Sequence, residues 1–109
     1  MKAIPRTICV DFDGVLHEYP AGILSYGHAG GRPVPGALRG MWELLSTGYH
    51  VVVLTARPVA AAARWIRENL GKGLLGKITV TNRKPTALAY IDDRAIRFTN
   101  WNDVTKYFA

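Results

Sequence analysis

The chain has no long hydrophobic run, and its 109 residues include a single cysteine. A membrane-spanning helix requires roughly 20 apolar residues in succession, so we expect a protein that does not cross a membrane. A lone cysteine excludes an intramolecular disulfide, and Cys9 stands in an apolar run, which favours a buried core residue over a nucleophile. The first residues lack the apolar segment and cleavage site of a secretory signal, so we expect a cytoplasmic protein.

Acidic residues are scarce relative to basic ones. The chain carries 14 Lys and Arg against 8 Asp and Glu, which gives a net charge of +6. This excess favours anionic partners such as phosphate esters or nucleic acid, although the basic residues are scattered in the manner of a solvated surface. Repeats and low-complexity segments are also absent, and the length predicts a single domain, 1–109.

Apolar segments alternate between the patterns of strands and helices. Five short β-rich runs predict strands at 7–10, 50–55, 77–80, 89–91 and 95–98. Amphipathic or terminal patterns predict helices at 35–48, 58–71, 85–88 and 101–108. Strands that alternate with helices predict an α/β fold in which right-handed crossovers build a mainly parallel sheet, with helices on both faces.

Residues 14–35, here called the flap, contain too many glycines and prolines for a long helix. A loop of this length in a small domain is usually functional, so we expect it to close over a site and to include at most a small hairpin. Polar side chains of the flap either contact a substrate or have no specific role; they are His17, Tyr19, His28 and Arg32.

Polar residues follow the predicted strands at the points where the strands end. Asp11 and Asp13 follow the first strand, Thr55 ends the second, and Asp92 and Asp93 end the fourth. Ligands of open parallel sheets bind outside the carboxyl ends of the strands, so we expect these residues to converge. Several carboxylates at one edge repel each other unless a cation joins them, and oxygen ligands suit Mg²⁺. The sequence therefore predicts a magnesium site.

The predicted chemistry is phosphoryl transfer. Asp11 is positioned to attack phosphorus and form an aspartyl phosphate, and Asp13 to protonate the leaving oxygen and then to activate water. The groups expected to meet phosphate oxygens belong to Phe12, Gly14, Thr55, Ala56, Arg57 and Lys84. Two of these also have structural interpretations, because Thr55 is able to cap the helix that begins near Pro58 and Arg57 to pair with an acid.

Four ordered motifs resemble those of the haloacid dehalogenase (HAD) superfamily, and the match spans residues 7–98. They are Asp11-Phe12-Asp13-Gly14-Val15-Leu16, Val53-Leu54-Thr55-Ala56-Arg57, Lys84-Pro85 and Tyr90-Ile91-Asp92-Asp93-Arg94. The resemblance implies a Rossmann-like three-layer sandwich with about five strands and no cap domain. It also implies a nucleophile, Asp11, an acid/base, Asp13, and phosphate ligands, Thr55 and Lys84. Magnesium would be held by Asp11, the Asp13 backbone carbonyl, Asp92 and Asp93.

The acid at Asp13 favours a phosphatase, because the dehalogenases and ATPases of the superfamily usually lack it. A site without a cap accepts a phosphorylated small molecule, with a second subunit of a homo-oligomer as a lid, or a bulky nucleic-acid end. Asp92-Asp93-Arg94 also resembles the 3′-phosphatase domain of phage polynucleotide kinases. Two interpretations from other classes stay open: a receiver-like phosphoacceptor module, and a magnesium-binding protein without catalytic activity.

Overall fold

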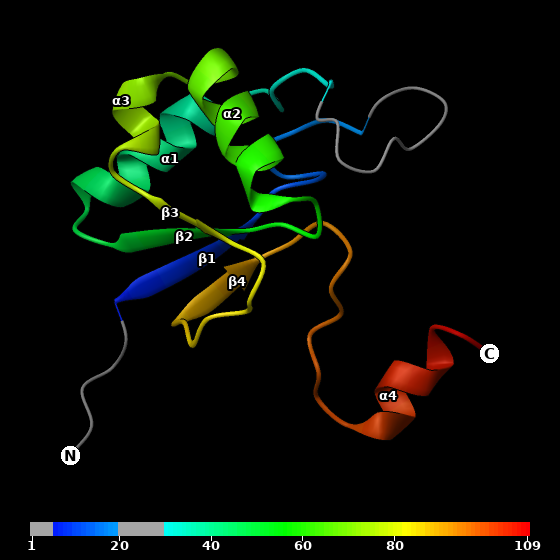
Figure 1. Ribbon diagram of the computed structural model, residues 1–109. Helices are drawn as coiled ribbons and strands as arrows, with labels where there is room; N and C mark the ends of the chain where they lie inside the picture. The colour runs from blue at the N-terminus through cyan, green and yellow to red at the C-terminus, as the bar shows by residue number, and fades with distance from the viewer. Residues whose placement is uncertain (1–5, 20–29) are drawn as a thin grey trace.

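The computed structural model describes residues 6–19 and 30–109, and its centre is a parallel sheet of four strands (Figure 1). The strands are β1 (Thr7–Asp11), β2 (His50–Leu54), β3 (Thr79–Thr81) and β4 (Ala89–Ile91). Their order in the sheet is β3-β2-β1-β4, and every neighbouring pair is parallel. The chain therefore winds in one direction from β1 to β3 and then crosses back to place β4 on the far side of β1.

Three helices cover one face of this sheet. They are α1 (Ala37–Ser46), α2 (Val59–Asn69) and α3 (Lys72–Leu75) (Figure 1). The connections through α1 and through α2 both advance in the same direction along the sheet, so right-handed crossovers place these helices on the same face. A fourth helix, α4 (Trp101–Lys106), lies beyond β4 and away from the other three.

The hydrophobic core lies between the sheet and these three helices. Alternate residues of the central strands face it, among them Val10 of β1 and Val53 of β2, and Trp65 and Ile66 of α2 close it from the other side. The intervening strand residue Cys9 is buried as predicted, at 2% exposure. Burial raises the pKa of the Cys9 thiol, so this residue behaves as a small buried apolar side chain.

Two predicted elements are wrong. Residues 85–88 form no helix, because the segment after β3 must cross three strand spacings of about 4.8 Å to reach β4, and a helical turn of four residues rises only about 6 Å. Residues 95–98 form no strand, since the chain turns at Asp92, whose Oδ1 accepts a hydrogen bond from the Arg94 N–H at 2.7 Å, and leads away from the sheet.

The sheet within 6–19 and 30–109 thus has four strands where about five were predicted, and its helices α1, α2 and α3 share one face where both faces were predicted to be covered. Trp101, the first residue of α4, is 71% exposed. The predicted helices at 35–48 and 58–71 are confirmed as α1 and α2, and α3 was not predicted. No helix in the described part of the chain is long and apolar enough to cross a membrane.

The two described ends of the flap pair with each other. The Glu18 N–H donates to the Arg32 carbonyl and the Val34 N–H to the Leu16 carbonyl, each at 2.8 Å. These bonds join the ends as in the small hairpin that was expected. The central part of the flap, with His28, lies outside the described residues.

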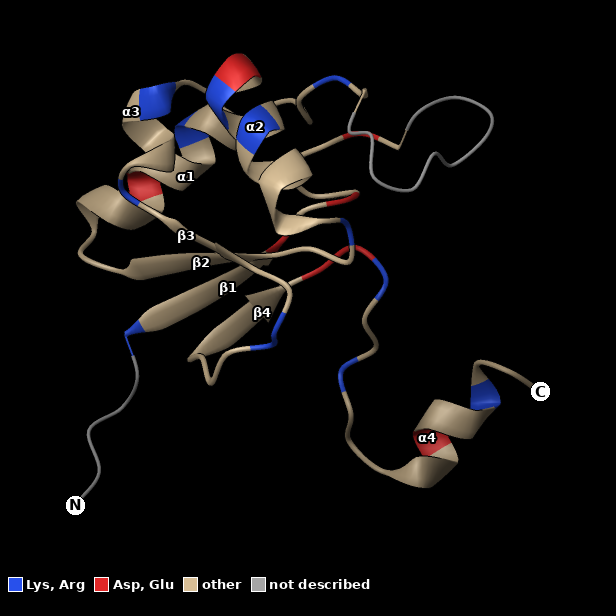
Figure 2. Ribbon diagram, in the orientation of Figure 1, with Lys and Arg blue, Asp and Glu red and all other residues tan. Residues whose placement is uncertain are grey.

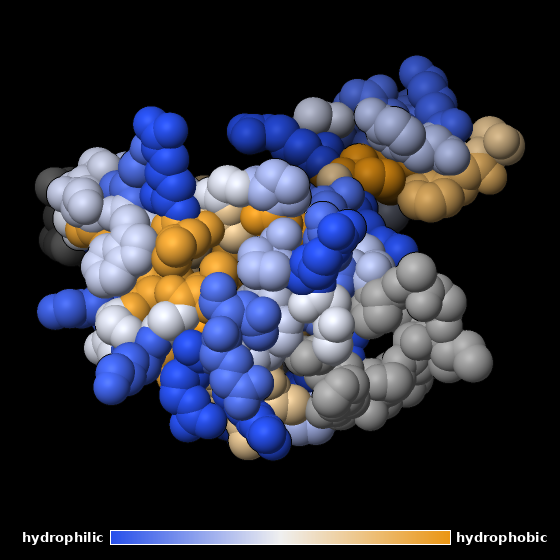
Figure 3. All heavy atoms as spheres, turned by 90° about the horizontal axis from the view of Figure 1, so that it is seen from above, coloured by the Kyte–Doolittle hydropathy of each residue, from blue (hydrophilic) through white to orange (hydrophobic). Residues whose placement is uncertain are grey.

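The surface reflects the charge balance of the sequence. Basic residues are spread over the helices and connecting segments. Single acidic residues lie on α1, α2 and α4, and a group of them lies at the carboxyl ends of β1 and β4 (Figure 2). The helix-covered side is largely hydrophilic, with apolar side chains gathered where α1 and α3 lie (Figure 3). Acidic charge is therefore concentrated at one edge of the sheet in a protein whose net charge is positive.

Candidate functional site

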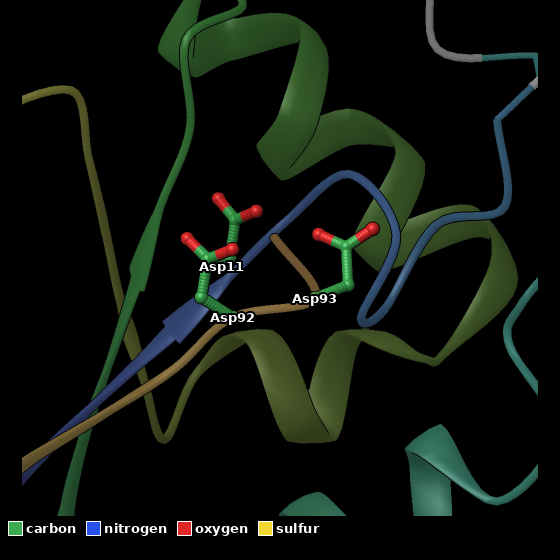
Figure 4. Close-up of side chains that lie close together, drawn as sticks. All are labelled: Asp11, Asp92 and Asp93. Atoms are coloured by element: carbon green, nitrogen blue, oxygen red, sulfur yellow. The ribbon is translucent and has the colours of Figure 1, made fainter. Parts of the chain in front are cut away.

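Three aspartates meet at the carboxyl edge of the sheet (Figure 4). Val10 of β1 and Ile91 of β4 are register partners, so the residues that follow, Asp11 and Asp92, leave the sheet side by side. Each of Asp11, Asp92 and Asp93 offers a carboxylate oxygen, and these oxygens lie within 4.8 Å of one another. We call these three residues the acidic cluster. It lies where the winding direction of the chain reverses, which is the usual ligand position in open α/β sheets.

The electrostatics of the acidic cluster are unfavourable without a cation. Burial and then the neighbouring Asp92 carboxylate raise the pKa of Asp11 from 3.8 to about 6, against the lowering effect of the Phe12 N–H. Asp93 and Asp13 raise it further. Three carboxylates without a nitrogen or sulfur ligand form a donor set that suits a hard divalent cation. The residues present therefore fit a hard divalent cation, the class to which the predicted Mg²⁺ belongs.

The raised pKa of Asp11 predicts that the metal-free fold loses stability as the pH rises from 4 to 7. The folded protein binds this proton more tightly than the unfolded chain, so the free energy of unfolding falls as Asp11 ionises. One pKa unit corresponds to about 1.4 kcal/mol. Solvent screening reduces the expected loss to about 1 to 2 kcal/mol. Urea unfolding in chelator, as a difference between wild type and Asp11→Asn, measures this loss.

Addition of Mg²⁺ should reverse the loss at pH 7 and have little effect at pH 4, because the cation binds the ionised carboxylates. Titrating groups that do not interact with Asp11 cancel in the difference between the two proteins. A difference in free energy of unfolding that stays constant between pH 4 and pH 7 would show that Asp11 has an ordinary pKa.

Gly14 fits closely against Asp93. Its φ is +85°, a conformation that L residues with side chains rarely adopt, and a Cβ at this position would overlap the Asp93 carboxylate. The sequence predicts phosphate binding by the Gly14 amide, but this N–H donates to the His17 carbonyl at 2.8 Å. The Phe12 N–H likewise donates to the Leu54 carbonyl at 3.0 Å. These two amides therefore already have partners within the protein.

Tyr19 links the two sides of the acidic edge. Its hydroxyl lies 3.4 Å from both Asp93 Oδ2 and the Asp13 carbonyl oxygen, and the Arg94 guanidinium stands 5.2 Å from the centre of its ring. Burial, and then the Asp93 charge, raise the pKa of this hydroxyl. The Asp13 carbonyl, which was predicted to contribute to the metal site, therefore lies at the margin of the acidic cluster.

The Asp13 carboxylate does not belong to the acidic cluster. Arg57 Nε donates to both of its oxygens, at 3.0 and 3.1 Å, and His17 Nδ1 lies 2.8 Å from Oδ1. Of the two interpretations of Arg57, pairing with an acid is the one observed, and the pair is more buried than a surface ion pair, since Arg57 is 7% exposed. The side chain of Asp13 keeps 21% exposure, so one side of it remains open to solvent.

Thr55 shapes the turn after β2. Its hydroxyl accepts a hydrogen bond from the Arg57 N–H at 2.9 Å, and its own N–H donates to the Thr81 carbonyl. Helix α2 starts after Pro58, so Thr55 holds this turn and does not cap the helix. Ala56 is the exposed residue of the turn. The turn places Arg57 against Asp13.

Lys84 lies beside β4. Its ammonium is 4.5 Å from the centre of the Tyr90 ring, and its charge lowers the pKa of Cys9 in opposition to burial. Tyr90 is the register partner of Cys9, so this contact is on the sheet face opposite the core. Lys84 is exposed, and its ammonium stands over the Tyr90 ring.

The role of His17 is not evident from the sequence. The side chain is completely buried, with hydrogen-bonding neighbours on both ring nitrogens. The local sequence does not distinguish His17 from an exposed loop histidine, because one of its hydrogen-bonding neighbours, Gly31, lies 14 residues away along the chain.

Comparison of the chain with protein-family models, with curated proteins and with solved structures finds no match.

Proposed function

We propose that this protein is a Mg²⁺-dependent phosphatase that hydrolyses a phosphate monoester through an aspartyl phosphate on Asp11. The observation that carries the proposal is the meeting of Asp11, Asp92 and Asp93, within 4.8 Å, at the carboxyl edge of β1 and β4. The four ordered motifs that resemble the HAD superfamily support the same activity, and with it a Rossmann-like core without a cap domain. A Rossmann-like sheet also agrees with the reversal of winding between β1 and β4.

In this proposal Asp11, Asp92 and Asp93 would hold the cation, whose positive charge would offset the repulsion between the phosphate and the attacking carboxylate. Asp11 attacks phosphorus through one carboxylate oxygen, the bond from phosphorus to the leaving oxygen breaks, and the leaving oxygen takes a proton from Asp13. Asp13 then takes a proton from water, whose oxygen attacks phosphorus. Inorganic phosphate departs and the Asp11 carboxylate is regenerated.

The second residue of the mechanism, Asp13, is held near the acidic cluster but outside it. Its carboxylate is fixed by Arg57 and His17, and its backbone carbonyl lies against Tyr19. A proton-transferring group needs a defined position and access to substrate, and the partly exposed Asp13 side chain has both. In this proposal Asp11 attacks phosphorus, and Asp13 transfers the proton.

A nucleic-acid 3′-end phosphatase is the alternative within this class. It is favoured by the exposed pair of Arg94 and Tyr19 directly beside the acidic cluster, because a guanidinium and an aromatic ring are suited to a phosphate backbone and a base. The net charge of +6 also favours a nucleic-acid substrate. A phosphorylated small molecule requires neither feature.

The proposal predicts hydrolysis of p-nitrophenyl phosphate that requires Mg²⁺ and stops in chelator. Parallel assays with a 3′-phosphorylated oligonucleotide and with sugar phosphates distinguish the substrate classes, and oligonucleotide binding that weakens steeply with salt would favour nucleic acid. Phosphate release is the measurement. If Mg²⁺ binds but none of these substrates is hydrolysed, the protein is a magnesium-binding or phosphoacceptor module and the proposal fails.

A further inference from the structure

His17 is a buried polar residue at the centre of a hydrogen-bond network that includes Asp13, and no step of the proposed chemistry uses the His17 side chain itself. Its ring is 0% exposed and stacks on Phe12, with centroids 4.9 Å apart and an interplanar angle of 8°. The Trp65 ring meets the imidazole edge to face, with centroids 5.0 Å apart and an interplanar angle of 86°. Two aromatic neighbours at such different angles leave the imidazole one orientation in the core.

The hydrogen bonds on the two ring nitrogens define the tautomer. The Gly31 N–H donates to His17 Nε2 at 2.8 Å, so Nε2 is an acceptor and carries no hydrogen. The ring hydrogen therefore resides on Nδ1, which donates to Asp13 Oδ1 at 2.8 Å. A backbone amide on one side of the ring thus determines that the other side is a donor to the carboxylate.

Gly31 is itself held in place. Trp65 Nε1 donates to the Gly31 carbonyl at 2.8 Å, so both backbone polar groups of Gly31 have partners. A Cβ at Gly31 would overlap the Glu18 carbonyl and come within 2.9 Å of His17 Nε2. The amide that orients His17 is therefore fixed by the core helix α2, through Trp65, and by the paired ends of the flap.

We propose that His17 is a positioning residue that sets the orientation of Asp13 for proton transfer; this inference rests on the proposed function. Arg57 Nε bonds both oxygens of Asp13 and thus resists displacement of the carboxylate, while His17 selects Oδ1 and so opposes rotation about the Cβ–Cγ bond. Because Oδ1 accepts from His17 Nδ1 as well as from Arg57 Nε, Oδ2 is the oxygen that exchanges the proton with the leaving group and with water. His17 does not touch the substrate.

The test compares two replacements of His17. In His17→Asn the side-chain amide reaches Asp13 as Nδ1 does, whereas in His17→Gln the longer side chain reaches toward Gly31 and loses the Asp13 contact. We expect His17→Asn to keep kcat within about threefold and His17→Gln to lower kcat about 10- to 100-fold with KM nearly unchanged. The replacement His50→Gln, at the exposed start of β2, is the control and should match wild type.

A second measurement does not depend on activity. Nitrogen chemical shifts of His17 in the wild-type protein should show a neutral ring with hydrogen on Nδ1, and hydrogen on Nε2 would overturn the inference. Equal kcat in His17→Asn and His17→Gln, with wild-type turnover present, would overturn it as well. If wild type hydrolyses no phosphate ester, the proposed function fails, and the inferred role in catalysis fails with it even where the tautomer is as assigned.

Discussion

Replacement of Asp11 by asparagine is expected to abolish Mg²⁺-dependent phosphate release, with a loss of at least about 10³-fold in kcat, while the folded protein becomes more stable. Asparagine keeps the shape of the side chain but cannot form the aspartyl phosphate. It also removes the carboxylate whose pKa is raised to about 6 by burial and by Asp92, and with it a source of repulsion. In chelator at pH 7 the gain in free energy of unfolding should be about 1 kcal/mol.

Asp11→Asn is an informative variant because its kcat should fall while its free energy of unfolding rises. A loss of activity through misfolding would lower stability, whereas loss of the nucleophile raises it. Glu68→Gln is the matched control, because it removes one negative charge from the exposed face of α2, far along the chain from the acidic cluster, and should change kcat little. Retained turnover in Asp11→Asn, measured as phosphate release, would exclude Asp11 as the nucleophile.

Replacement of Gly14 by alanine is expected to weaken Mg²⁺ binding and kcat by about 10- to 100-fold each. The new Cβ would occupy the position of the Asp93 carboxylate, so Asp93 must turn away from Asp11 and Asp92. The positive φ of +85° adds a conformational cost of about 1 kcal/mol or more. Calorimetric titration with Mg²⁺ and the phosphate assay measure the two losses.

Gly36→Ala separates the effect on Asp93 from backbone strain. Gly36 has nearly the same φ, +84°, and within the described part of the chain a Cβ there would meet nothing within 4 Å beyond its own chain neighbours. Alanine at this position therefore introduces strain alone. We expect Gly36→Ala to lose stability by a similar amount and to keep wild-type Mg²⁺ affinity. Equal Mg²⁺ affinity in both variants would mean that the contact between Gly14 and Asp93 has no part in cation binding.

Part of the candidate site follows from local sequence pattern. The β-branched runs mark β1 and β2, and parallel strands bring their carboxyl ends to one edge, so the meeting of Asp11 with Asp92 and Asp93 was predictable once β4 was recognised. The same reasoning failed for side-chain partners. It gave Asp13 a role in proton transfer at this edge, but it did not predict that Arg57 and His17 together hold the Asp13 carboxylate.

The sequence by itself thus determined the α/β class, the positions of β1, β2, α1 and α2, and the edge at which the carboxylates converge. These follow from hydrophobic periodicity and strand direction, which are properties of short segments. The tertiary structure decided the non-helical path of 82–88 and the burial of His17 between Phe12 and Trp65. Those features depend on contacts between residues distant along the chain, and no local period encodes them.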